Sequence, residues 1–173
     1  TVTQESDAMI VRWDSFSIGR DETVTFVQPG PTSVALNRVT GAAPSEIFGR
    51  LQSDGRLFLI NPHGVLFGET AQVDVGGLVA STLDMSNGDF LAGNYRFTAG
   101  GPGLPGDVTV DAGATLTARE GGYVVLLGHR IQSDGSIAAK LGTVALGAGG
   151  EVRLELLAGG LIDIVIDGTA PGA

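Results

Sequence analysis

The chain has 173 residues, enough for one domain with a substantial core. It carries 19 acidic against 10 basic residues, a formal net charge of −9, and this excess argues against binding to nucleic acid or to anionic lipid. It has no cysteine, which excludes a disulfide scaffold, a thiolate zinc site and a cysteine nucleophile.

Short strands joined by many turns are favoured from the start of the chain. The 28 glycines disfavour helices, where each glycine costs about 1 kcal/mol. Residues 9–13, 16–18 and 23–27 alternate apolar and polar positions, which predicts half-buried strands, and Val34–Leu36 predicts another. We expect Trp13, Phe16 and Phe26 to cover the end of a core, and a sugar platform is the less favoured alternative.

Residues 57–68 predict strand, tight turn and strand. Asn61, Pro62, His63 and Gly64 form the turn between two apolar flanks. Asn at the first position, Pro at the second and Gly at the fourth are typical of a type I turn. The Asn61 side chain is expected to bond to the backbone two residues on, which is worth about 1 kcal/mol.

A repeat of about 20 residues becomes visible in the second half. The segment 113–118 resembles 135–139 at an offset of 22, and 122–127 resembles 142–146 at an offset of 20. Residues 51–57 and 131–137 also share a Gln-Ser-Asp-Gly string. Strand-rich, glycine-punctuated repeats of this length predict a parallel β-helix, in which each coil stacks on the next.

Stacking predicts which side chains are buried and where the pattern breaks. Val124, Leu126, Val144 and Leu146 are expected to be buried in register. Residues 84–89 interrupt the repeat, and we expect a small hairpin outside the helix made of Phe90–Leu91 and Tyr95–Phe97. Residues 151–156 and 161–166 alternate strictly and predict the last strands.

The sequence gives little support for a catalytic function. His63 and His129 are the only histidines, and no Gly-x-Ser-x-Gly or His-Glu-x-x-His string accompanies them. Asp54 and Asp134 occupy equivalent places in the two Gln-Ser-Asp-Gly strings, and a carboxylate pair for glycoside cleavage is conceivable. Asp-Gly is also common turn chemistry, which is the favoured interpretation. We therefore expect no enzyme activity, cofactor, metal or small-molecule substrate.

Several long strings resemble one known family. Residues 57–68 resemble the Asn-Pro-Asn-Gly segment in the amino-terminal secretion domain of filamentous-haemagglutinin-like exoproteins, which use two-partner secretion. His63 departs from the usual second Asn, and no Asn-Pro-Asn-Leu string is present. Further matching strings follow in order at 12–19, 24–29, 35–39, 73–82 and 121–128.

The resemblance implies a fold and a partner. The fold would be all-β, a right-handed parallel β-helix with an N-terminal capping sheet. Residues 1–173 would form a single secretion domain, trimmed at its amino end, of a much larger exoprotein. The partner would be an outer-membrane transporter whose periplasmic POTRA domains recognise this domain, with Asn61, Pro62, His63 and Gly64 as the recognition or folding turn.

The resemblance also implies a location and leaves one alternative open. The exoprotein would pass through the periplasm of a Gram-negative bacterium and end secreted or on the cell surface. The domain would be monomeric and would nucleate β-helix folding of the passenger outside the cell. Alternatively, it would be an adhesin module that binds host or matrix glycan directly.

Overall fold

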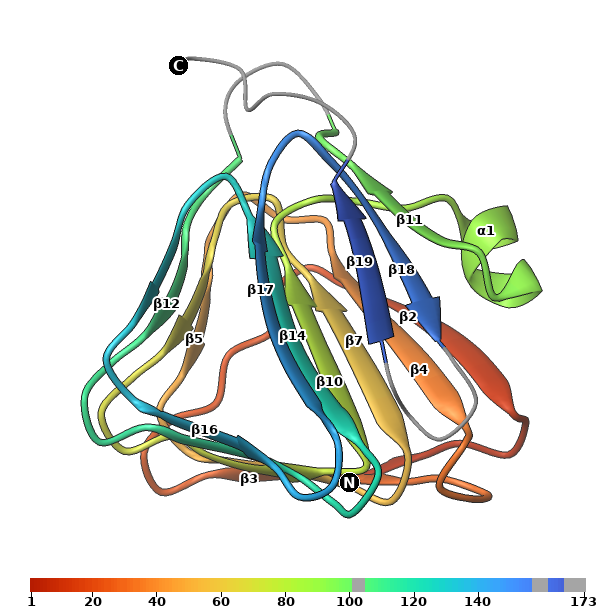
Figure 1. Cartoon of the computed structure of the whole chain (residues 1–173). Helices are drawn as coiled ribbons and strands as arrows, with labels where there is room; N and C mark the ends of the chain where they lie inside the picture. Colours follow the sequence, from red (N-terminus) through yellow and green to blue (C-terminus); the bar gives the residue numbers. More distant parts are fainter. Residues whose placement is uncertain (101–104, 157–161, 167–173) are drawn as a thin grey trace.

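The structure is a computed structural model and describes residues 1–100, 105–156 and 162–166. Figure 1 shows a stack of coils in which strands recur at the same positions of successive coils. Parallel pairing joins each strand to its counterparts in the neighbouring coils. The right-handed parallel β-helix expected from the sequence is thereby confirmed.

Three parallel sheets form the walls of the stack in the described part of the chain. In stacking order, sheet A consists of β1 (Val2–Thr3), β3 (Thr23–Val27), β6 (Arg50–Ser53), β9 (Gln72–Val75), β13 (Thr115–Ala118) and β16 (Ser136–Ala139). Sheet B consists of β17 (Thr143–Ala148), β14 (Tyr123–Gly128), β10 (Gly77–Ser81), β7 (Arg56–Ile60), β4 (Val34–Val39) and β2 (Ala8–Trp13). Sheet C consists of β15 (Ile131–Ser133), β12 (Val108–Val110), β8 (Val65–Phe67) and β5 (Ser45–Ile47).

An antiparallel outer sheet and a short helix lie outside the stack. The outer sheet has the order β11 (Tyr95–Thr98), β18 (Glu151–Leu156) and β19 (Ile162–Ile166). Helix α1 (Asn87–Ala92) precedes β11, and both lie beside sheet B in Figure 1. Among the described residues no helix has the length and apolar character needed to cross a membrane.

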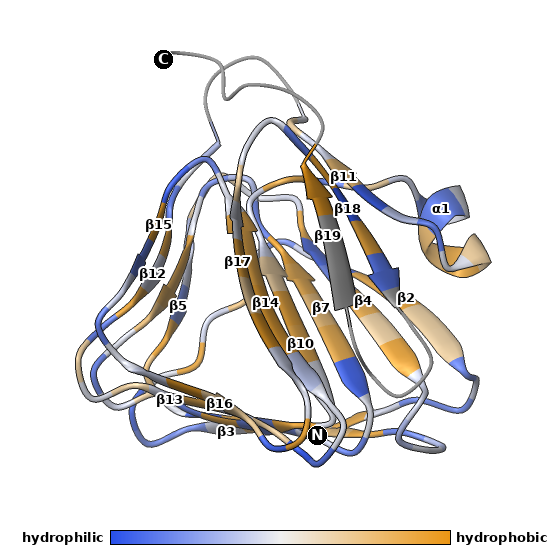
Figure 2. Cartoon of the chain, viewed as in Figure 1, coloured by the Kyte–Doolittle hydropathy of each residue, from blue (hydrophilic) through white to orange (hydrophobic). Residues whose placement is uncertain are grey.

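The central strands of sheet B are buried on both faces, and their sequences reflect this. Leu57 and Leu59 of β7 belong to the inner core, whereas Phe58 and Ile60 belong to a second core on the outer face. A strand with two buried faces needs consecutive apolar residues. Figure 2 shows this hydrophobic character along β7 and β14. By contrast, β9 of sheet A alternates exposed and buried residues, because one of its faces meets solvent.

Small residues let the coils approach at the corner between sheets A and B. Gly76, Gly122 and Gly142 occupy this corner in successive coils. A Cβ on Gly76 would lie 2.6 Å from the carbonyl oxygen of Gly55, and Cβ atoms on Gly122 and Gly142 would clash with carbonyl oxygens of the preceding coil. This corner therefore requires glycine, which explains part of the glycine content.

The observed register tests the repeat. Tyr123 pairs with Thr143, which confirms the offset of 20. Thr115 pairs with Ser136, an offset of 21 rather than the expected 22. The pairings of Val124 with Val144 and of Leu126 with Leu146 are also confirmed. Their expected burial is wrong for the second member of each pair: Val144 is 44% and Leu146 53% exposed, because β17 is the last strand of sheet B.

The two ends of the predicted fold differ in detail from expectation. No separate N-terminal capping sheet is present in the described residues, because β1 and β2 pair parallel with β3 and β4 and extend sheets A and B. Phe16 and Phe26 are buried in the inner core and Trp13 packs against it, as expected for residues that cover its end. The last strands are confirmed as β18 and β19, although Leu161 lies outside the described residues.

The expected hairpin over Phe90–Leu91 and Tyr95–Phe97 is wrong. Residues 87–92 form α1, because the Ser86 hydroxyl caps the helix by accepting a hydrogen bond from the Asp89 N–H. Gly93 ends the helix in the left-handed conformation, with φ of 72°. Strand β11 then pairs with β18, so the hairpin outside the stack is formed by β18 and β19.

Candidate functional site

The turn Asn61–Gly64 joins β7 to β8 and has the predicted local bonds. The Gly64 N–H donates to the Asn61 carbonyl oxygen at 3.1 Å, which closes the turn. The His63 N–H donates to Asn61 Oδ1 at 3.0 Å, as expected for an Asn side chain that bonds to the backbone two residues on. Gly64 has φ of 127°, a conformation that favours glycine.

The side chain of Asn61 also ties this turn to the preceding coil. Asn61 is fully buried. Its Nδ2 donates to the Ala43 carbonyl oxygen and to Ser45 Oγ, both at 3.0 Å. Its backbone N–H donates to the Ser81 carbonyl oxygen at 2.9 Å. Asn61 therefore links three successive coils, which the sequence did not reveal.

The remaining turn residues divide into backbone contacts and an exposed side chain. The Pro62 carbonyl oxygen accepts from the Gly106 N–H at 2.8 Å, and the Gly64 carbonyl oxygen accepts from the Ser45 N–H at 3.0 Å. A Cβ on Gly106 would lie 2.5 Å from the His63 backbone. The His63 side chain is exposed. The imidazole therefore takes no part in the bonds that hold the turn.

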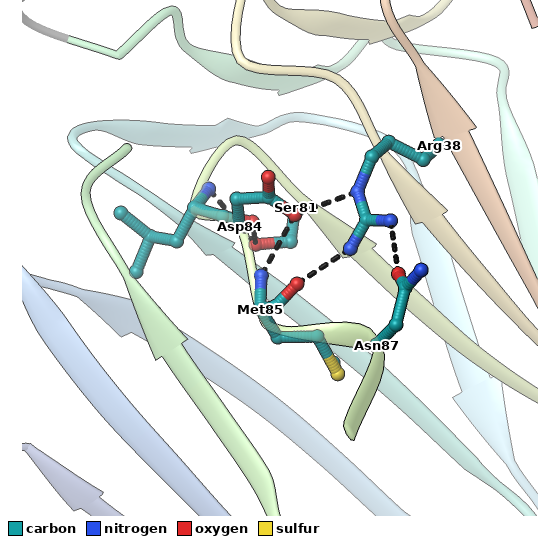
Figure 3. Close-up of polar contacts among 6 residues, drawn as sticks. Arg38, Ser81, Asp84, Met85 and Asn87 are labelled. Carbon is teal, nitrogen blue, oxygen red and sulfur yellow. Dashed lines mark hydrogen bonds and ion pairs between the residues drawn. The ribbon is translucent and has the colours of Figure 1, made fainter. Parts of the chain in front are cut away.

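A second polar site lies one coil further, where the chain leaves β10 for α1. We call Arg38, Asp84, Met85 and Asn87 the Arg38 cluster (Figure 3). Arg38 Nε contacts Asp84 Oδ1 at 3.0 Å, and its other two nitrogens donate to Asn87 Oδ1 and to the Met85 carbonyl oxygen. The Arg38 side chain is only 11% exposed. All three guanidinium nitrogens are thus used to hold the link to α1.

The Arg38 cluster was not predicted from the sequence, although the sequence contains a signal for it. Arg38 lies in the segment 34–39, whose other residues are mostly apolar, and a charged residue inside a buried strand requires a partner. Its carboxylate partner, Asp84, is 46 residues away in sequence. Backbone bonds further fix Asp84, because its N–H donates to the Thr98 carbonyl oxygen at 2.9 Å and it accepts from the Thr98 N–H at 2.8 Å.

Aromatic side chains fill the second core beneath α1 and β11. The Phe58 ring lies 5.6 Å from Phe90, 4.8 Å from Tyr95 and 6.4 Å from Phe97, measured between ring centroids. Val152 and Leu154 of β18 complete this core. Burial raises the pKa of Tyr95, an effect that nearby Arg56 partly opposes. The aromatic core therefore joins pieces of chain that are far apart in sequence.

The carboxylate pair considered from sequence does not occupy equivalent places. Asp54 follows β6 at the corner between sheets A and B, whereas Asp134 follows β15 at the corner between sheets C and A. Asp54 Oδ1 lies 3.6 Å from Arg119 Nη1. The shared Gln-Ser-Asp-Gly string is thus common turn chemistry at two different corners. Within the described residues, no group of three or more His, Asp or Glu side chains could hold a metal ion.

Open hollows occur on the surface, and two of them are lined by several charged or polar side chains. One of about 640 Å³ lies between α1, β11 and β18, and its charged lining residues are Asp89, Arg96, Glu151, Arg153 and Glu155. The other, about 290 Å³, lies on the outer face of sheet A, and its polar lining residues are Arg50, Gln52, Gln72, Asp74, Thr115 and Thr117. Neither lining includes a histidine.

One protein family and two proteins of Haemophilus influenzae are similar in sequence to this chain. Residues 1–167 match the family described as TPS secretion domain. Over 98 residues the chain is 40% identical to a heme/hemopexin-binding protein of Haemophilus influenzae, covering 57% of this chain and 11% of that protein. Over 154 residues it is 34% identical to the heme/hemopexin-binding protein of H. influenzae strain ATCC 51907, covering 86% of this chain and 17% of the relative.

A solved structure shares the whole fold. The crystal structure of the HMW1 secretion domain from H. influenzae superposes with a TM-score of 0.88 at 29% sequence identity. The match covers 99% of this chain and 47% of that chain. The chain thus spans about half of the solved domain and 11–17% of the curated relatives.

Proposed function

Because the chain belongs to the TPS secretion domain family, we propose that it directs a larger exoprotein to a dedicated transporter in the outer membrane of a Gram-negative bacterium. The observation that carries this proposal is the family match over residues 1–167. The mature protein would be secreted or held at the cell surface after transit through the periplasm. The test is export of this fragment from cells with and without the cognate transporter. Equal export in both would contradict the proposal.

The transporter would recognise the chain through its periplasmic POTRA domains before the chain folds. A stacked β-helix needs a wide pore, whereas an extended chain needs a narrow one. An unfolded strand offers unpaired backbone groups to which a partner can add a strand. Purified POTRA domains should therefore bind the monomeric domain freshly diluted from denaturant more tightly than the folded domain. Tighter binding to the folded form would refute recognition of the extended chain.

Once outside, the domain would nucleate the folding of its passenger. Each coil contacts only its neighbours, so a finished stack templates the next coil. Asn61 and its turn would contribute by joining three coils early. Replacing Asn61 by Ala should then lower export more than replacing exposed His63 by Asn. The reverse order would show that the roles are assigned wrongly.

We propose no catalytic activity for this domain. The support is the placement of Asp54 and Asp134 at different corners. A panel of glycans and esters should stay at background with the purified fragment. Turnover that disappears in Asp54→Asn or Asp134→Asn would overturn this.

A second candidate is an adhesin module that binds host or matrix glycan directly. It is favoured by the hollow on sheet A, because amide, hydroxyl, guanidinium and carboxylate groups can bond to sugar hydroxyls. A glycan array separates the candidates. Binding that Gln52→Ala and Gln72→Ala abolish would support the adhesin, and export would remain unchanged in both variants.

A further inference from the structure

The chain contains one Asn-Gly dipeptide, Asn87–Gly88, at the start of α1. An asparagine followed by glycine is the pair most prone to deamidation, because a residue without a side chain lets its backbone nitrogen reach the preceding side-chain carbonyl carbon. Gly88 is exposed, and a Cβ built on it would lie 3.9 Å from Ser86 Oγ, the nearest atom beyond its chain neighbours and the helix backbone. As the second residue of α1, Gly88 has an N–H without an acceptor inside the helix.

The side-chain amide of Asn87 is held by its oxygen and not by its nitrogen. Arg38 Nη1 donates to Asn87 Oδ1 at 2.5 Å (Figure 3), whereas Asn87 Nδ2 donates no hydrogen bond to the described residues. The two buried asparagines differ, because Nδ2 of Asn61 and Nδ2 of Asn37 each donate two hydrogen bonds. At Asn87 the guanidinium therefore lies where negative charge would develop on Oδ1 if the carbonyl carbon were attacked, and the –NH2 group is free to leave.

We propose that Asn87 deamidates spontaneously in the folded domain. The Gly88 nitrogen attacks Asn87 Cγ, and Nδ2 leaves as ammonia with the proton that the Gly88 nitrogen gives up, which forms a cyclic succinimide. One water molecule then opens the ring, so the net change is replacement of –NH2 by –OH. Attack of water at Cγ leaves aspartate at position 87 with the main chain intact, whereas attack at the main-chain carbonyl carbon gives isoaspartate. Only the terminal turn of α1 has to open for this reaction, and helix ends fray.

The aspartate product gives Arg38 a second carboxylate. Asp84 Oδ1 already contacts Arg38 Nε at 3.0 Å, and a carboxylate at position 87 turns the neutral hydrogen bond at Nη1 into a charge-assisted one. The Arg38 side chain is only 11% exposed, so salt screens this pairing weakly. Deamidation to aspartate therefore stabilises the link between sheet B and α1, and it does so irreversibly.

Mass spectrometry of the intact chain and of its peptides tests the site. At body temperature and mildly alkaline pH, the wild-type chain should gain the mass difference between –OH and –NH2 at position 87. The gain should be at least tenfold faster than at Asn94, an exposed asparagine followed by Tyr95. Gly88→Ala should slow it at least tenfold, since the methyl group hinders the attacking nitrogen. Equal rates at the two asparagines, or a gain at position 87 only after unfolding in urea, would overturn the proposal.

A pair of variants separates the charge of Arg38 from its effect on the mobility of α1. Arg38→Met removes the guanidinium, and Phe90→Ala loosens α1 by removing its buried ring while Arg38 stays in place. Because Arg38 holds the charge that develops on Oδ1, Arg38→Met should deamidate at least tenfold more slowly than Phe90→Ala. An equal or faster reaction in Arg38→Met would refute the role given to Arg38.

The consequence is tested by supplying the product's charge directly. Asn87→Asp should raise the urea concentration at the midpoint of unfolding of the full chain. In the Arg38→Met background the same substitution should leave the midpoint unchanged or lower it, because the new carboxylate has no guanidinium to bind. A rise of equal size in both backgrounds, or a lower midpoint for Asn87→Asp alone, would contradict the stabilisation of the Arg38 cluster by deamidation.

Discussion

The corner between sheets B and C is built in two ways in successive coils. After β7 the chain crosses it in the four residues Asn61–Gly64, whereas the described residues between β10 and β12, which begins at Val108, include α1 and β11 outside the stack. The short crossing is held by side-chain and backbone bonds to adjacent coils. The long crossing carries α1 and β11 and needs a core of its own.

The two crossings are completed by partners that lie at different distances along the chain. The Asn61 turn has all its bonding partners within residues 43–106, so it is finished once the neighbouring coils stack. The long crossing is finished only when β18 covers β11. Local chemistry thus suffices for the first, and long-range packing decides the second. Substitutions should therefore separate the two in both size and location of their effects.

The largest effect is expected from Phe58→Ala. Phe58 is fully buried and its ring contacts Phe90, Tyr95 and Phe97. Removing a buried phenylalanine ring costs about 3–5 kcal/mol in the free energy of unfolding. Urea unfolding measures it, and Leu91→Ala on the exposed side of α1 should cost less than about 0.5 kcal/mol. A cost for Phe58→Ala below that of the control would show that the second core contributes nothing to stability.

The second-largest effect is expected from Arg38→Ala. This change breaks the polar contacts that hold the long crossing but removes no side chain from the second core. It removes three bonds made by a mostly buried guanidinium and leaves Asp84 without its cation. The expected loss is about 1.5–3 kcal/mol, the range for hydrogen bonds to charged groups. Arg20→Ala breaks an exposed pair with Glu69 and should cost less than about 1 kcal/mol. Equal losses in the two variants would contradict the role of the Arg38 cluster.

Asn61→Ala should have a smaller but localised effect on the short crossing. It removes one acceptor and two donor contacts of a buried amide. The expected loss is about 2 kcal/mol, larger than the single turn bond that the sequence predicted, because the partners are left unsatisfied. His63→Asn should change stability by less than about 0.5 kcal/mol, since the imidazole is exposed. Hydrogen exchange should speed up around residues 61–64 and leave α1 unaffected.

Whether the sequence predicts a contact depends on how far apart the two contacting residues lie along the chain. The short crossing was predictable, because Asn61 and Gly64 act within four residues. The register of Tyr123 with Thr143 was predictable from the repeat. The coil-linking bonds of Asn61 and the partners of Arg38 were not, because contacts between coils leave no local mark in one sequence.

The helix α1 was not predicted for a different reason. Ser86 and Asp89 form an N-terminal cap and Gly93 a C-terminal one, and these signals were present in the sequence. Phe90 is the one fully apolar residue that α1 buries, so the helix has too short an apolar stripe to be recognised by periodicity.

The smallest expected effect concerns Leu141, where corner chemistry can be tested without either crossing. Leu141 has φ of 50° at the place that Gly121, with φ of 73°, occupies one coil earlier. The left-handed conformation costs a leucine about 1–2 kcal/mol, whereas a new glycine costs about 0.4–1 kcal/mol through the unfolded chain. Since Leu141 is 76% exposed, little packing is lost, and Leu141→Gly should stabilise the domain by about 0.5 kcal/mol. Leu141→Ala is the control in urea unfolding, because it shortens the side chain and keeps the strain. Stabilisation by Ala as large as that by Gly would mean that the exposed apolar side chain, and not the backbone conformation, is what disfavours leucine at this corner.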